Sequence, residues 1–183
     1  MMFRDLKAEE IDVRISTVSE KGLSLLLYKD ARVDQDVLDE TVGPKNWERD
    51  HKELKGNIYC GISIWDEDKK IWVTKWDCGK ESFSDAEKGE ASDSFKRAGF
   101  NWGIGRELYT SPFIWVKAED CNIKDSERKD AKGKIIYTCS DKFMVEKIKI
   151  VNKKIVGLSI RNEKNGKRVF TYFEQTTENK GDK

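Results

Sequence analysis

The sequence is poor in the residues from which metal sites and acid–base sites are commonly built. Its 183 residues include one histidine, His51, and two prolines. The four cysteines form no Cys-x-x-Cys pair, so a zinc site is not indicated, and we expect free thiols in a reducing compartment. These cysteines are Cys60, Cys78, Cys121 and Cys139. With one histidine, expected on a polar strand at the surface, imidazole-based catalysis has few options.

Long apolar segments are also missing. No hydrophobic run approaches the ~20 residues of a membrane-spanning helix. The N-terminal segment MMFRDLKAEE lacks an apolar core of signal-peptide length. We therefore expect a soluble cytoplasmic protein that does not associate with membranes.

The motifs of nucleotide-driven and metal-dependent enzymes are absent as well. No Gly-x-x-x-x-Gly-Lys-Ser/Thr phosphate loop occurs, which argues against ATP-driven strand exchange. The acids Asp66, Glu67 and Asp68 fall in a predicted hairpin turn without further acids at nuclease spacing, so a solvated turn is the better interpretation. The sequence therefore predicts a protein that is not an enzyme and that carries neither a cofactor nor a metal.

Net charge is close to zero, but the basic residues are unevenly distributed. The formal net charge of +1 gives by itself no support for nucleic-acid binding. Residues 141–170 contain nine Lys/Arg against three Asp/Glu, whereas residues 1–140 contain 24 against 28. Any basic surface in the first part must therefore arise from folding, with the acids sorted to another face.

Hydrophobic periodicity predicts an α+β fold centred on an antiparallel three-stranded β-meander. Its strands are expected at 47–54, 57–65 and 71–76, because apolar and polar residues alternate along the second and third of these segments. Three elements are predicted before the meander: a short amphipathic helix over 7–15, an extended segment over 23–28, and a helix from Asp30 to about Val42 that Gly43 ends.

A longer helix is predicted after the meander, from about Glu87 to Trp102, and we expect it to pack on the sheet. Ser84 and Glu87 match a capping box, in which each side chain satisfies a backbone amide of the first turn. Apolar residues recur at helical spacings of four, three and four residues: Ala91, Phe95, Ala98 and Trp102. A short strand is expected next, over 113–116.

The chain is expected to divide into a core and a C-terminal appendage. Residues 1–116 would form the core, and residues 117–134 are charged and weakly patterned, as in a loop or linker. A basic β-rich segment is predicted over 135–173. Residues 174–183 are expected to form a disordered tail.

A basic pair, Lys96 and Arg97, lies beside the apolar stripe of the predicted long helix. At the rim of a core these side chains could reach into a groove, and Gly99 would let another backbone approach. The pair suits phosphate contact, because lysine is a compact charge and arginine a planar fork. From the residues alone, an ordinary solvated helix face is the commoner interpretation.

The stretch from Ser92 to Tyr109 resembles the signature helix of the Rad52/Rad22 family of single-strand annealing proteins, which includes phage and prophage members. The family pattern combines an aspartate, a Lys-Arg-Ala triplet and an aromatic-Gly pair. It stands here as Asp93, Lys96, Arg97, Ala98, Trp102 and Gly103. A second block, residues 28–47, is similar to the family's early helix and the turn after it. The resemblance covers about residues 8–116.

The resemblance implies that single-stranded DNA lies in a groove of an oligomeric ring, with phosphates on basic residues and bases turned outward. Lys96 and Arg97 match the basic pair of that groove, and Arg32 matches a basic residue at the start of the early helix. Candidates for a basic hairpin region are Lys69, Lys70, Lys75 and Lys80. Phe100 stands where some members carry a further arginine. This difference either weakens the electrostatic site or replaces a charge with a stacking surface.

The function implied is binding of single-stranded DNA and ATP-independent annealing of complementary strands in recombination or repair. The chain would act as a homo-oligomeric ring or filament, with a single-strand binding protein or an exonuclease as candidate partners. Two alternatives stay open. One is a passive protector of single strands or DNA ends, and the other is a protein-interaction or assembly module, which the acidic balance of residues 1–140 favours. The basic segment 141–170 is either a second DNA contact or a solvated face.

Overall fold

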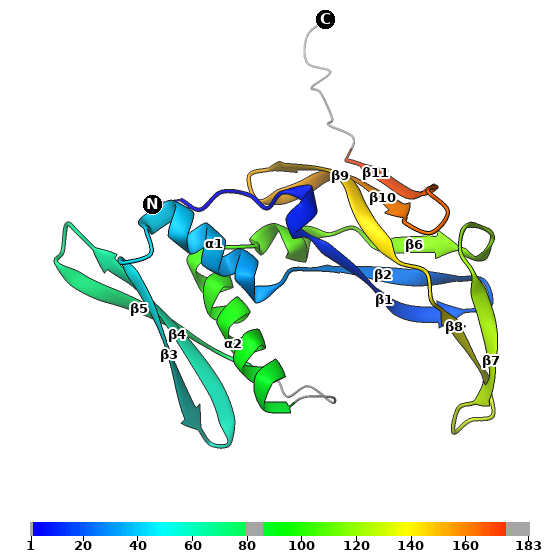
Figure 1. Cartoon of the computed structure of the whole chain (residues 1–183), viewed down its shortest axis with the longest axis horizontal. Helices are drawn as coiled ribbons and strands as arrows, with labels where there is room; N and C mark the ends of the chain where they lie inside the picture. Colours follow the sequence, from blue (N-terminus) through cyan, green and yellow to red (C-terminus); the bar gives the residue numbers. More distant parts are fainter. Residues whose placement is uncertain (1, 80–85, 175–183) are drawn as a thin grey trace, which may run out of the picture. The chain divides into compact units, whose positions relative to one another are not determined.

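The computed structural model describes residues 2–79 and 86–174 and divides the chain into two units (Figure 1). The first unit comprises Met1–Leu6 and Lys29–Arg106, and the second comprises Lys7–Tyr28 and Glu107–Lys183. Each unit therefore combines segments that are distant in sequence.

The first unit contains the predicted meander. It is an antiparallel sheet with strand order β3-β4-β5: β3 (Trp47–Leu54), β4 (Asn57–Asp66) and β5 (Ile71–Cys78). Lys55 and Gly56 join β3 to β4 with φ angles of 55° and 76°. Positive φ at both positions matches the twist of a two-residue hairpin. The predictions of an α+β fold and of a three-stranded antiparallel sheet are confirmed.

Two α-helices belong to this unit, α1 (Ala31–Val42) and α2 (Ala86–Trp102). The carboxylate of Asp30 caps α1 by accepting a hydrogen bond of 2.8 Å from the backbone amide of Arg32. Gly43, with φ of 85°, ends the helix at the predicted residue. Helix α1 contacts α2 and β3, and α2 packs on β4 and β5.

Apolar and polar contacts together join α2 to the sheet. Phe95 and Ala98 are buried in a core that also includes Ile62 of β4. The indole Nε1 of Trp102 donates to the Ile62 carbonyl at 2.9 Å, and the Asn101 amide donates to the Trp76 carbonyl at 3.1 Å. These bonds set the position of the last turn of α2 along β4 and β5. The predicted capping box lies outside the described residues, since neither Ser84 nor the side chain of Glu87 is described.

The second unit is built on a six-stranded antiparallel sheet with strand order β11-β10-β9-β1-β2-β6. Its terminal strands β11 and β6 approach each other, so the sheet curls toward a barrel. The strands are β1 (Asp12–Ser19), β2 (Gly22–Tyr28), β6 (Ile114–Lys117), β9 (Phe143–Val151), β10 (Lys154–Asn162) and β11 (Arg168–Phe173). A separate hairpin consists of β7 (Ile123–Lys129) and β8 (Ile135–Cys139). Short 3-10 helices span Ala8–Glu10, Arg106–Thr110 and Ala118–Asp120.

The helix predicted over residues 7–15 was wrong. Only Ala8–Glu10 are helical, as a 3-10 turn, and β1 begins at Asp12. Ile11 and Ile15 lie four apart, a spacing that fits both a helix face and one face of a strand. Val13 also alternates with polar neighbours, and pairing with β2 across a tight turn selects the strand.

The expectation of a loop over residues 117–134 was also wrong for most of that stretch. It contains a 3-10 turn and β7, which pairs with β8. Most side chains of β7 are exposed, so the strand lacks the apolar alternation by which strands are recognised. The two units also do not follow the linear division expected, because β1 and β2 join the C-terminal strands in one sheet. From residue 175 on, the predicted tail lies outside the described residues.

Phe95→Ala should lower the free energy of unfolding by about 3–5 kcal/mol, because it opens a cavity at a ring that is 1% exposed. Urea unfolding followed by tryptophan fluorescence measures the change. Leu54→Ala is the control in the same unit, since Leu54 is 57% exposed, and it should change the value by no more than about 0.5 kcal/mol. Equal losses in the two variants would show that Phe95 does not anchor this core.

Candidate nucleic-acid interface

Lys96 lies near a buried ion pair at the start of α1. The Lys29 ammonium donates to the carboxylate of Asp34, and both side chains are buried. Two glycines make room for this pair. A Cβ at Gly99 would lie 2.8 Å from Asp34 Oδ1, and one at Gly105 would lie 2.4 Å from Lys29 Cε. The sequence therefore lets the C-terminal part of α2 approach the pair more closely than side chains would allow.

The pKa of the Asp34 carboxyl is raised above its ordinary value. Burial raises its pKa from 3.8 to about 6, while the charges of Lys29 and Lys96 act in the opposite direction. Its Oδ1 atom has no hydrogen-bond partner among the described residues. The carboxylate of Asp34 thus lies close enough to Lys96 to attract it, in a setting where desolvation is the larger effect.

Arg97 is oriented by the carboxylate of Asp93, one turn earlier on α2. The Nε of Arg97 lies 2.8 Å from Asp93 Oδ2, and each side chain is 34% exposed. Such a partly exposed pair contributes little to stability, about 0.2–1 kcal/mol. Its effect is to hold the guanidinium at the helix surface with part of its edge open to solvent.

A further cation, Arg106, lies just beyond α2. Its guanidinium donates to the Phe100 carbonyl at 2.9 Å and to the Asn101 carbonyl at 3.1 Å, and its central carbon is 5.5 Å from the centre of the Phe100 ring. Basic side chains commonly satisfy the last carbonyls of a helix. A guanidinium therefore lies beside position 100, although the residue there is phenylalanine.

Two of the predicted hairpin lysines share one cavity in the first unit. Lys69 and Lys75 contribute to a cavity of about 470 Å³ whose wall includes Trp65 and Trp102. The acids of the hairpin turn, residues 66–68, line the same cavity, so its charged lining as a whole is not basic. The ammonium of Lys75 donates to the Asn101 carbonyl at 2.9 Å and lies 4.3 Å from the centre of the Trp102 ring. A desolvated cation over an indole face is attracted by the ring. Lys75 thus connects β5 to the end of α2 and presents one charge to the cavity.

The other predicted residues lie elsewhere. Lys70 pairs with Glu67 at the tip of the β4–β5 hairpin, and Lys69 pairs with Asp66 at 3.0 Å. Arg32 is exposed at the start of α1, with its Nε 3.8 Å from Asp30. Lys80 lies outside the described residues. The structure thus brings Lys69 and Lys75 into one cavity and Lys96 beside Asp34, while Arg32 and Lys70 pair with residues close to them in sequence.

Sequence reasoning missed Lys29, Asp34 and Arg106. A signal for Asp34 was present, because it lies four residues before Leu38 on the buried side of α1, where an acid needs a partner. Arg106 follows Gly103 and Gly105 in the quoted motif, at the place where helix C-termini favour basic residues. The role of Lys29 had no signal of its own, because the carboxylate that pairs with it comes from α1.

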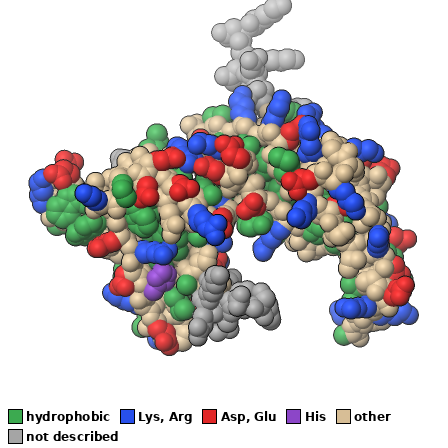
Figure 2. Space-filling model, in the orientation of Figure 1, with side chains coloured by type: hydrophobic (Ala, Val, Ile, Leu, Met, Phe, Trp, Pro, Cys, Tyr) green, Lys and Arg blue, Asp and Glu red, His purple; other side chains and the backbone are tan. Residues whose placement is uncertain are grey.

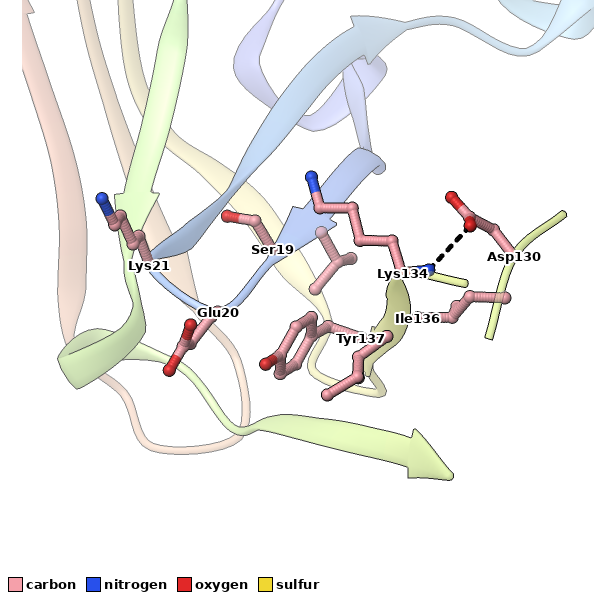
Figure 3. A pocket seen from close by; sticks show the side chains of 9 residues that line it. Ser19, Glu20, Lys21, Asp130, Lys134, Ile136 and Tyr137 are labelled. Atoms are coloured by element: carbon pink, nitrogen blue, oxygen red, sulfur yellow. Dashed lines mark hydrogen bonds between the residues drawn. The ribbon is translucent and has the colours of Figure 1, made fainter. Parts of the chain in front are cut away.

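A larger cavity of about 620 Å³ in the second unit lies between the β1–β2 turn and β8 (Figure 3). Its charged lining is balanced, with Glu20 and Asp130 against Lys21 and Lys134. Figure 3 shows the hydrogen bond that the backbone amide of Lys134 donates to Asp130 Oδ1, at 2.9 Å. This cavity therefore offers a phosphate no net attraction.

The described residues contain neither a candidate metal site nor a candidate membrane span. No group of three or more histidine, cysteine or acidic side chains there could hold a metal ion. No helix within residues 2–79 and 86–174 is both long and apolar enough to span a bilayer.

Asp34→Asn should flatten the pH dependence of the unfolding free energy between about pH 4 and pH 6. The pKa of Asp34 is about 6 in the folded protein against an ordinary 3.8, so the folded state holds the proton more tightly. The contribution of this group to stability therefore falls as pH rises through that interval. Urea unfolding of the wild-type and Asp34→Asn proteins at several pH values in this interval measures the pH dependence. Lys29, Lys96 and Asp30 are unchanged in both proteins. A difference between the two proteins that is constant with pH would contradict the assignment.

The first unit and the start of the second correspond to a known family. The sequence model of the Rad52/22 family of double-strand break repair proteins matches residues 2–128. The single-stranded DNA-binding protein DdrA of Deinococcus radiodurans is 35% identical over 102 residues, which are 52% of this chain and 46% of DdrA. The chain thus spans less than half the length of this relative. No solved structure matches significantly. The match over residues 2–128 shows that the chain belongs to the Rad52/22 family of double-strand break repair proteins.

Proposed function

We propose that this protein binds single-stranded DNA and anneals complementary strands in double-strand break repair or recombination. The observation that carries the proposal is the Lys96–Arg97 pair, which lies on α2 within the matched residues. Asp93 pairs with Arg97, and Lys96 lies close enough to Asp34 to act on its pKa. Both side chains are partly exposed, so their cationic groups can contact phosphates.

The surrounding cations extend this site in the proposal. Lys75 and Lys69 share a cavity with Trp65 and Trp102. Lys69 pairs with Asp66 there, so the cation that this cavity offers a phosphate is Lys75, over the Trp102 ring. Arg106 adds a guanidinium over the Phe100 ring. Charge combined with aromatic faces is a common arrangement for single-strand binding.

Annealing needs no nucleotide hydrolysis under this proposal. Basic side chains would hold the phosphates in an extended line, and the free base edges would test a second strand, so that base pairing supplies the driving force. Several subunits side by side, as a ring or filament, would form one continuous track including Arg32. A single-strand binding protein or an exonuclease would supply the single strands.

A passive binding role is the second candidate. The name of DdrA describes single-stranded DNA binding and not annealing. A protein that covers the bases would slow the pairing of complementary oligonucleotides, whereas one that leaves them outward would accelerate it. Fluorescence quenching on mixing two complementary labelled strands, with increasing protein, separates the candidates, and we expect acceleration.

Replacing Lys96 and Arg97 together by glutamine should weaken single-strand binding and slow annealing. Loss of two phosphate contacts should reduce the slope of log affinity against log salt by about 1.4, since each contact contributes roughly 0.7 for single strands. Anisotropy of a labelled oligothymidylate at several salt concentrations measures it.

The matched control is Lys45→Gln with Lys55→Gln, two exposed lysines of the same unit. It removes the same charge and should leave the slope nearly unchanged. If the slope of log affinity against log salt falls equally in both double variants, the loss reflects net charge alone. The role assigned to Lys96 and Arg97 is then wrong.

A further inference from the structure

The outward face of β9, β10 and β11 in the second unit carries four cations: Lys147, Lys149, Arg161 and Arg168. All four are exposed, while Ile160, which precedes Arg161, is buried on the opposite face. Figure 2 shows lysine and arginine side chains gathered along the upper margin, where Figure 1 places these strands. The side chain of Ile160 thus lies on the inner face of the sheet, and those of Ser159 and Arg161 lie on the outer face.

The carboxylate of Glu146 pairs with both arginines of this face. Glu146 accepts from Arg168 Nε at 2.5 Å and from Arg168 Nη2 at 3.1 Å, and it also accepts from Arg161 and from the Ser159 hydroxyl at 3.2 Å. These donors lower the pKa of Glu146 to about 2, so it stays ionised at neutral pH. Two guanidiniums against one carboxylate leave a positive charge in excess, and both guanidiniums are fixed in place.

The two lysines add charge that is not compensated locally. Register places Lys147 opposite Ser159 and Lys149 opposite Gly157 on the same face as the arginine pair. No carboxylate in the described part of the chain lies within ion-pair distance of either lysine. Their stems are about 6.6 Å apart along β9, since a strand rises about 3.3 Å per residue. Successive phosphates of an extended single strand have a similar spacing.

An exposed aromatic ring lies beside these cations. Phe173 is 72% exposed and pairs with Gly157 across β10 and β11. A Cβ at Gly157 would lie 3.3 Å from Phe173 Cδ1 and 3.3 Å from Lys149 Cβ, so the ring lies against the glycine next to the stem of Lys149. An aromatic face next to a row of cations is suited to stack an unpaired base while the phosphates are held.

We infer that the outward face of β9–β11 is a second binding surface for single-stranded DNA, with the phosphates on Lys147, Lys149 and the arginine pair and a base on Phe173. This face lies beyond residues 2–128, to which the family model extends. The inference rests on the proposed function for the class of ligand, but it assigns a separate site. The exposed ring favours a single strand over a duplex, whose bases are already stacked.

The test is the binding of a labelled oligothymidylate by the full-length chain, measured by anisotropy across a salt series. Lys147→Gln with Lys149→Gln should reduce the slope of log affinity against log salt by about 1.4. Phe173→Leu should weaken binding about fivefold or more without changing the slope, because stacking does not release counterions. A duplex of the same length should compete less well than the single strand.

Lys129→Gln with Lys132→Gln is the matched control, because both lysines are exposed in the β7–β8 hairpin region of the same unit. Thermal melting checks that all variants are folded. The inference would be overturned if the slope for Lys147→Gln with Lys149→Gln equalled that of the control. It would also be overturned if Phe173→Leu left the affinity for the oligothymidylate unchanged.

The Lys96→Gln/Arg97→Gln variant, measured in parallel, separates the two sites. If only this variant changes the slope, the proposed function stands and the second surface does not exist. If only the β9 variant changes it, the second surface stands and the role of Lys96 and Arg97 fails.

Discussion

The buried ion pair of Lys29 and Asp34 constrains how the helices of the first unit pack. Removing two charges from water costs several kcal/mol for each ion, and contact between the charges offsets that cost only if their geometry is kept. Lys29 directly follows β2 and Asp34 lies in the first turns of α1, so the pair fixes the conformation of the link between them. Gly99 and Gly105 then become necessary, because any side chain there would displace one partner. Lys96 lies on the same helix as Gly99, close enough for its charge to act on Asp34.

Aromatic rings hold many of the cations in place. Lys75 lies 4.3 Å from the Trp102 ring centre, Lys52 lies 4.4 Å from that of Trp76, and the Arg49 guanidinium lies 5.2 Å from that of Phe95. A ring attracts a cation without cancelling its charge, whereas a carboxylate cancels it. These three cations therefore keep their positive charge although the net charge of the chain is only +1. Several acids are placed in turns and at helix ends, where they pair with exposed lysines, and other cations rest on indole or phenyl faces.

Much of the first unit could be predicted because its signals are local. The alternation along β4 and β5 depends on neighbouring residues, and so does the Asp30 cap of α1. Hydrophobic periodicity gave a wrong prediction at Ile11 and Ile15, whose spacing fits both the helical and the strand period. It also failed at β7, because most side chains of that strand are exposed. The site residues Lys96 and Arg97 were predicted from a motif. The acid that orients Arg97 lies one turn away on the same helix, whereas the acid near Lys96 comes from α1 and no local signal connects the two.

The second unit shows why a segment outside the family match cannot be treated as an independent attachment. Strands β1 and β2 lie within residues 2–128, yet they belong to one sheet with β9–β11, which β1 joins at Asp12 and Met144. Removing the C-terminal strands would leave the outer edge of β1 without that neighbour. It would also remove Ile155, Leu158 and Ile160 from the buried face of the sheet. Exposed edges and newly exposed apolar surface favour aggregation. A truncation that lost DNA binding could therefore reflect a damaged sheet. Exposed side chains such as Lys147 and Lys149 can be changed with the sheet intact, so the function of this face is accessible only through point substitutions.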